Sequence, residues 1–173
     1  ERVCTYPQQH LVPFLGYLTG WALEISENLS LHYPETFDKL ISKLIEGLCS
    51  PYSLKTRIVR SNRQPDWMMQ AMNAAAGDIA RALLHDPRHN EFHSLWLRHV
   101  ERLLTLRNET RYYALVIFAH NLNWFFNMDS HWTKTNLLFV LKEDNEENLN
   151  AFWNGFLSSQ TIPISDLYLY LKT

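Results

Sequence analysis

The side chains best placed to bind an anion gather in the least regular part of the chain, between residues 50 and 65. They are Lys55, Arg57, Arg60 and Arg63. A basic loop of this kind can contact the phosphate oxygens of a nucleotide or a nucleic acid. No aromatic side chain is interleaved with the four charges, so they are a weak footprint for nucleic acid. A solvated loop paired with carboxylates such as Glu46 is the simpler interpretation, and phosphate contact is kept as the alternative.

Three histidines at intervals of four residues, His85, His89 and His93, are the next candidates. On an unbroken helix this spacing would place three imidazoles on one face, as zinc sites use. The Asp86-Pro87 step falls inside the run, and the residue before a proline is pushed out of helical geometry. We therefore predict a polar connection between helices here, with diverging rings and no metal site.

The remaining candidates lie far apart in the sequence. His99 and His120 lie beside apolar stripes, and we interpret both as hydrogen-bonded core residues rather than catalytic bases. Cys4 and Cys49 match no CxxC or zinc spacing, and Cys49 is expected to pack at a helix end. Reduced thiols in a cytoplasmic protein are predicted, with one disulfide as the alternative.

No known catalytic pattern joins these residues. The chain holds five glycines, too scattered for a phosphate-binding loop, and it lacks the GxSxG, HExxH and Walker patterns. A Cys–His nucleophile would need a positioned base, which nothing in the sequence supplies. We expect no enzyme, no catalytic residue, no cofactor and no metal.

Composition bounds the kind of protein that carries these residues. The 173 residues are 46% apolar and 20% charged, with a net charge of −2, which is typical of a folded domain without a general basic field. The longest strongly apolar stretch, at 112–119, is far shorter than the ~20 residues of a membrane span. We therefore expect no membrane partner. The chain starts with Glu1 rather than Met, so we also expect a piece of a larger protein.

Helical periodicity dominates the chain and predicts about seven helices. They cover 8–27, a stretch from Pro34 to Leu48, 66–84, a stretch from Phe92 to Leu103, 109–126, a stretch from Asp129 or Ser130 to about Leu141, and a stretch from Asp144 to Leu157. A last segment after Pro163 alternates in polarity, and we interpret it as helix rather than strand. The short connections predict an all-α fold of irregularly stacked helical hairpins, α-solenoid-like or an orthogonal bundle, forming one domain over 1–173.

Several of these helices carry specific expectations. The first should bury one apolar stripe and kink at Pro13. The third has the small residues 74–77, which predict a close helix crossing. The fifth is apolar nearly all round, which is typical of a central helix. Asp144 and Glu147 resemble a capping box. The stripe of the first helix comprises Leu11, Phe14, Leu15, Leu18, Ala22 and Ile25.

Three stretches together resemble a known family: NAAAGDIARALL at 73–84, AHNLNWFFNMDSHWT at 119–133 and AFWNGFL at 151–157. They are similar to the C-terminal helical domain, of unknown function, of large bacterial proteins with an N-terminal sirtuin-like (SIR2) NAD-consuming module. Such proteins are associated with defence against phage. The resemblance covers residues 66–173 and implies that the chemistry resides in the SIR2-like module. It carries over no catalytic residue to this chain.

The leading interpretation is therefore a non-enzymatic helical scaffold or interaction module of a larger bacterial protein. It would sense a trigger, hold a homo-oligomer or restrain an effector, with a protein partner or other domains of the same chain. The alternative is a nucleic-acid-binding module that uses the basic loop together with Arg107 and Arg111. A third hypothesis is a hydrolase whose histidines and carboxylates converge in a pocket only after folding.

Overall fold

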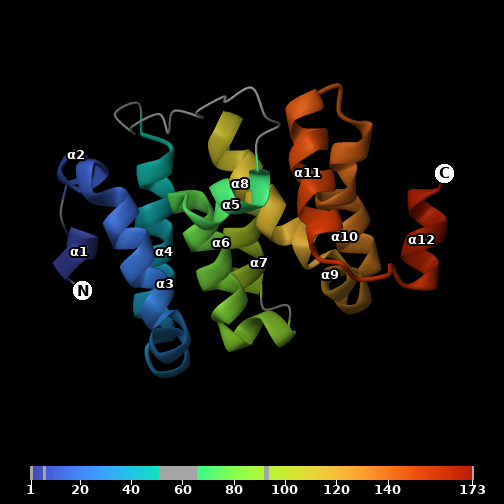
Figure 1. The fold of residues 1–173 in the computed structure, drawn as a ribbon. Coiled ribbons are helices and arrows are strands. Elements are labelled where there is room, and N and C mark those ends of the chain that lie inside the picture. Colours follow the sequence, from blue (N-terminus) through green and yellow to red (C-terminus); the bar gives the residue numbers. More distant parts are fainter. Residues whose placement is uncertain (1, 6, 51–65, 92–93, 173) are drawn as a thin grey trace.

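The computed structural model describes residues 2–5, 7–50, 66–91 and 94–172. This part of the chain is all-helical, with no strand among the described residues, as the periodicity predicts. The helices follow one another from one end of the molecule to the other, from α3 and α4 to α12 (Figure 1). There are more helical elements than the seven predicted, because turns divide several of the predicted helices.

The N-terminal end begins with the short helices α1 (Arg2–Thr5) and α2 (Gln8–Leu11). A 3₁₀ turn, η1 (Val12–Phe14), then contains Pro13 and leads into α3 (Leu15–His32). The restart at Pro13 is the predicted kink, since a proline removes one helical donor and crowds the preceding turn. The helix α3 runs five residues beyond the predicted end at residue 27.

The helix α4 (Pro34–Leu48) follows after a single residue and packs against α3. Its proline occupies the first turn, where the missing N–H would have no helical partner in any case. The predicted apolar stripe of α4 is confirmed. Its buried members are Phe37, Leu40, Ile41, Leu44, Ile45 and Leu48.

The predicted helix over 66–84 is in fact two helices, α5 (Trp67–Met72) and α6 (Ala75–His85). The chain turns at Asn73 and Ala74, and Gly77 then lies so close to α5 that a Cβ on it would collide with the carbonyl oxygen of Ala71. The small residues do serve a close approach, but to the preceding helix. The turn also places Met69 and Met72 in solvent rather than in the predicted stripe.

The helix α6 ends at His85, immediately before Asp86-Pro87, as predicted. A 3₁₀ turn, η2 (Pro87–Glu91), and α7 (Ser94–Leu104) follow it. The predicted helix over 109–126 is divided at Asn121 into α8 (Asn108–His120) and α9 (Leu122–Met128). Every residue from Tyr113 to Ala119 is buried, so the prediction that this helix is central is confirmed.

The C-terminal part contains α10 (Ser130–Asn136), the 3₁₀ helix η3 (Leu138–Lys142), α11 (Glu146–Ser158) and α12 (Ser165–Leu171). Asp129 caps α10 by accepting a hydrogen bond from the Trp132 amide at 2.9 Å. The predicted capping box at Asp144 is wrong. Asn145 caps α11 instead, since its side chain accepts from the amide of Asn148 at 3.0 Å.

The core is built around α8, which packs most extensively against α11 and also against α5, α6 and α7. Gly155 of α11 permits this close pairing, because a Cβ there would collide with the carbonyl oxygen of Val116 on α8. An aromatic cluster continues the core toward α7, α9 and α10. Its rings are those of Trp96, Phe118, Trp124, Phe125 and Trp132.

Candidate functional site

The basic cluster Lys55, Arg57, Arg60 and Arg63 lies outside the described residues, so its phosphate contact stays a prediction. The structure does place the two arginines that were grouped with it. Arg111 forms an ion pair with Glu143 at 2.6 Å, and Arg107 is exposed at the start of α8. Arg111 is thus part of an internal contact between α8 and the turn before α11.

The histidine series does not converge on one point among the described residues. His85, in α6, lies 3.4 Å from the Ser26 hydroxyl, whereas His89, in η2, donates from Nδ1 to the carbonyl of Asp86 at 2.6 Å. His93 lies outside the described residues. No group of three or more His, Cys, Asp or Glu side chains in the described part of the chain could hold a metal ion.

The cysteines and the two other histidines have separate roles. Cys4 is partly buried against the core, and Cys49 is exposed at the end of α4; both are free thiols. The expectation of packing is therefore wrong for Cys49. His120 lies 3.0 Å from the Ser158 hydroxyl, and His99 is buried with Nε2 3.2 Å from Asp38 Oδ1, so both are hydrogen-bonded as expected.

The densest group of charges surrounds Arg88. Its guanidinium donates to both carboxylate oxygens of Asp38 at 2.9 Å and to both oxygens of Asp86 at 2.6–3.0 Å. Asp86 is fully buried, and its carboxylate also accepts the Arg88 amide at 3.0 Å. The arrangement joins α4 to η2 through residues 50 positions apart.

The electrostatics of this group keep Asp38 and Arg88 ionised. Burial alone would raise the pKa of Asp38, but hydrogen bonds from His99 and Arg88 outweigh it and lower that pKa to about 2. Burial would likewise lower the pKa of Arg88, while its bonds to Asp38 and Asp86 raise it above the ordinary value. All four carboxylate oxygens accept a hydrogen bond from Arg88. The group acts as a structural clamp.

Other polar contacts extend this clamp along the same side of α3 and α4. Thr19 lies 3.0 Å from Asp78 Oδ2, and Arg102 donates to the Ser42 hydroxyl at 3.2 Å. We call the set the polar seam. It consists of the contacts Thr19–Asp78, Ser26–His85, Asp38–Arg88–Asp86, Asp38–His99 and Ser42–Arg102.

The face of α3 that meets the rest of the molecule is made of small and hydroxyl side chains. Its buried residues are Leu15, Thr19, Ala22, Ser26 and Ser30. Ser26 donates to the carbonyl of Leu23 at 2.7 Å and Ser30 to that of Glu27 at 3.2 Å, so their polar atoms are satisfied inside. Small side chains let α3 approach α6 and α4 closely.

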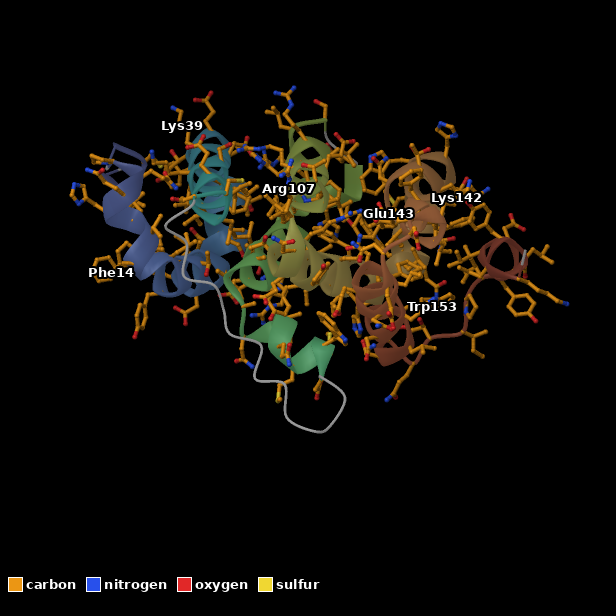
Figure 2. All side chains as sticks on the ribbon, turned by 90° about the horizontal axis from the view of Figure 1, so that it is seen from above. Phe14, Lys39, Arg107, Lys142, Glu143 and Trp153 are labelled. Carbon is orange, nitrogen blue, oxygen red and sulfur yellow. The ribbon has the colours of Figure 1, made fainter. Side chains whose placement is uncertain are left out.

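The opposite face of α3 holds large aromatic side chains in solvent. Phe14 is 60% exposed, Tyr17 84% and Trp21 44%. Phe14 is the last residue of η1, directly before α3, and we call these three residues the aromatic face of α3. Figure 2 shows Phe14 at the outer edge of the α3 end of the molecule. The predicted stripe is thus partly wrong: Leu11, Leu15 and Ala22 are buried, Phe14 is exposed, and Leu18 and Ile25 are only partly covered.

The Asp, Glu, Lys and Arg side chains of residues 3–38 are all acidic. No Lys or Arg occurs between Arg2 and Lys39, whereas Glu24, Glu27 and Glu35 all fall there and are exposed. Trp21 and Glu24 are three residues apart on α3 and therefore neighbours on its surface. An apolar stripe bordered by carboxylates is the result.

Sequence reasoning missed this face because it followed the large apolar residues. A different signal marks the buried side. Leu15, Thr19, Ala22, Ser26 and Ser30 also recur at helical spacing, and every one after the first is small or carries a hydroxyl. That second stripe indicates a helix buried by close packing, with its aromatic residues left outside.

Comparisons with known protein families, with curated proteins and with solved structures find no match. The resemblance to the domain of SIR2-like bacterial proteins therefore stays a prediction. None of the described helices combines the length and the apolar character that crossing a membrane requires.

Proposed function

We propose that this chain is a non-enzymatic protein-interaction module and that a protein partner docks on the aromatic face of α3. One observation carries the proposal: α3 buries its hydroxyl-bearing side and leaves Phe14, Tyr17 and Trp21 in solvent. Three neighbouring exposed aromatic side chains are unusual on a monomeric surface, and aromatic residues are enriched where partners bind.

The polar groups support the same proposal. The polar side chains of the seam hydrogen-bond to one another across helices, and Arg88 pairs with the carboxylates of both Asp38 and Asp86. Such contacts hold α3 and α4 in place against α6, η2 and α7. They would fix the aromatic face in a rigid position, which lowers the entropy lost on binding.

The setting of the module is a wider proposal that rests on the resemblance. We propose a cytoplasmic bacterial protein in which a SIR2-like module belongs to the same chain and takes part in defence against phage. The docking partner is then another domain of that protein or a separate sensor protein. The three stretches at 73–84, 119–133 and 151–157 support this setting.

The docking proposal is tested by photocrosslinking in the cells that produce the protein. A benzophenone amino acid replaces Tyr17 in one variant and Tyr168 in a matched control, because Tyr168 is also exposed, on α12. We expect a discrete crosslinked protein from position 17 that is absent from position 168. Equal or absent crosslinking at the two positions would overturn the proposal.

A further inference from the structure

We infer that the segment docked on the aromatic face of α3 is an amphipathic helix whose apolar stripe is bordered by Lys or Arg. The inference rests on the proposed function and names the chemistry of its partner. Its two parts, the shape of the apolar stripe and the sign of the surrounding charge, come from separate observations.

The shape of the stripe suits a second helix. Five exposed or half-buried apolar residues, one directly before α3 and four within it, follow the spacing i, i+3, i+4, i+7 and i+11, which lays a ridge along one side of the helix. These residues are Phe14, Tyr17, Leu18, Trp21 and Ile25. A ridge of this kind is what packing against a second helix requires.

The charge around the stripe selects a basic partner. Glu24 and Glu27 are exposed on α3, and no ion pair among the described residues involves either of them. The nearest cations in the sequence are Arg2 and Lys39, which lie outside α3. Lys or Arg beside the partner's apolar stripe would therefore meet free carboxylates, which raises the association rate and fixes the register.

The same charges argue against two other occupants. A second copy docked by a two-fold axis would bring a second set of the same carboxylates to the interface and no Lys or Arg from its own α3. The exposed area of the three aromatic side chains is roughly 400 Å², about half of the ~800 Å² that each partner buries in a stable interface. A membrane with anionic headgroups would be repelled by the glutamates.

The test measures binding of two labelled helical peptides to the full chain by fluorescence anisotropy. Both peptides carry the same leucine stripe; one has Lys and Arg beside it and the other has Glu. We expect the basic peptide to bind about tenfold more tightly or better, with the difference shrinking as salt is added. The double variant Tyr17→Ser/Trp21→Ser should weaken it by about tenfold or more, and Glu24→Lys/Glu27→Lys should reverse the preference.

The matched control is Tyr168→Ser/Leu169→Ser, which removes two exposed apolar side chains of α12 and should leave peptide binding unchanged. All these positions are exposed, and circular dichroism and thermal unfolding verify that each variant is folded. Equal binding of the two peptides, or no effect of the charge reversal, would overturn the inference.

Further measurements distinguish the basic helix from the two other occupants, and they distinguish the inference from the proposed function. A concentration-dependent dimer abolished by Tyr17→Ser/Trp21→Ser would assign the face to a second copy, and binding to vesicles of phosphatidylglycerol and phosphatidylcholine would assign it to a membrane. Either result overturns the inference. A crosslink at position 17 without peptide binding would remove the inference and leave the proposed function standing. Absence of the crosslink and of peptide binding together would overturn both the inference and the proposed function.

Discussion

The two ends of the molecule are attached to its centre by different means. At the N-terminal end, α3 and α4 meet α6, η2 and α7 through the polar seam in addition to the apolar stripe of α4, and Arg88 pairs there with two carboxylates. Toward the C-terminus, α11 meets α8 through apolar side chains and through the bare backbone at Gly155. The first interface adds a network of charges and hydrogen bonds to its apolar contacts, whereas the second is distinguished by a close backbone approach.

The difference explains how two helices of similar sequence character have opposite surroundings. Both α3 and α8 carry apolar residues around most of their circumference. The helix α8 is enclosed by α5, α6, α7 and α11, so its apolar residues are buried. The helix α3 packs mainly on α6 and α4, using small and polar side chains, so its aromatic residues remain outside. An apolar side chain that the fold leaves exposed is available to bind a partner.

The largest expected effect is a difference in the free energy of unfolding between alanine substitutions at two phenylalanines. Phe118→Ala, in α8, removes a fully buried ring and should lower the free energy of unfolding by about 3–5 kcal/mol. Phe14→Ala, at the aromatic face, should change it by no more than about 0.5 kcal/mol. Urea unfolding followed by circular dichroism measures both. Similar losses in the two variants would mean that α3 is buried in solution.

Two glycines give opposite expectations for one substitution. Gly155→Ala forces α11 away from Val116 and should cost about 1–3 kcal/mol of stability. Gly16→Ala meets no atom within 4 Å and should be neutral or stabilise the protein, by up to about 1 kcal/mol, because alanine is the better helix former. Thermal unfolding of both variants measures the two changes in stability. A stable Gly155→Ala protein would show that the two helices do not approach as closely as described.

Acid should weaken the polar seam. The pKa of Asp38 is lowered from 3.8 to about 2, so its contribution to stability is complete above pH 3.8 and is lost as the pH falls toward 2. Asp38→Asn should therefore lose about 1–3 kcal/mol at neutral pH, and the difference from wild type should shrink over that interval. Hydrogen exchange at pH 7 and pH 3 should show α4 and η2 opening before α8 and α11. Simultaneous opening of all four would contradict the distinction between the two ends.

The smallest effect concerns a single hydroxyl of the seam. Ser26→Ala removes the bond to the Leu23 carbonyl and the contact with His85, which should cost about 0.5–1.5 kcal/mol. The matched change Ser159→Ala removes a comparable bond to the Phe156 carbonyl outside the seam, together with contacts to Thr161, at a residue that is only partly buried, whereas Ser26 is fully buried. Chemical unfolding should show the larger loss for Ser26→Ala. A gain in stability there would mean that the hydroxyls of α3 are not needed for its packing.

Much of the fold could be predicted from local patterns. The apolar stripe of α4, the helix end at Asp86-Pro87 and the cap at Asp129 all depend on residues within one or two turns. The divisions at Asn73 and Asn121 could not be predicted, because apolar periodicity continues through both turns. The sequence pattern predicts the cap of α11 one residue too early, because Asp144 and Asn145 are both acceptable capping residues.

The sequence by itself determined that the chain is helical, where most helices lie and that α8 is central, because those properties depend on spacing along the chain. Only the tertiary structure decided which side of α3 is buried and which charges pair. Periodicity shows which residues share a face, but the neighbour that packs closest determines the face that is covered, and for α3 small residues allowed the closer approach. In the same way, Asp38 meets Arg88 across 50 positions only because packing brings α4 and η2 together.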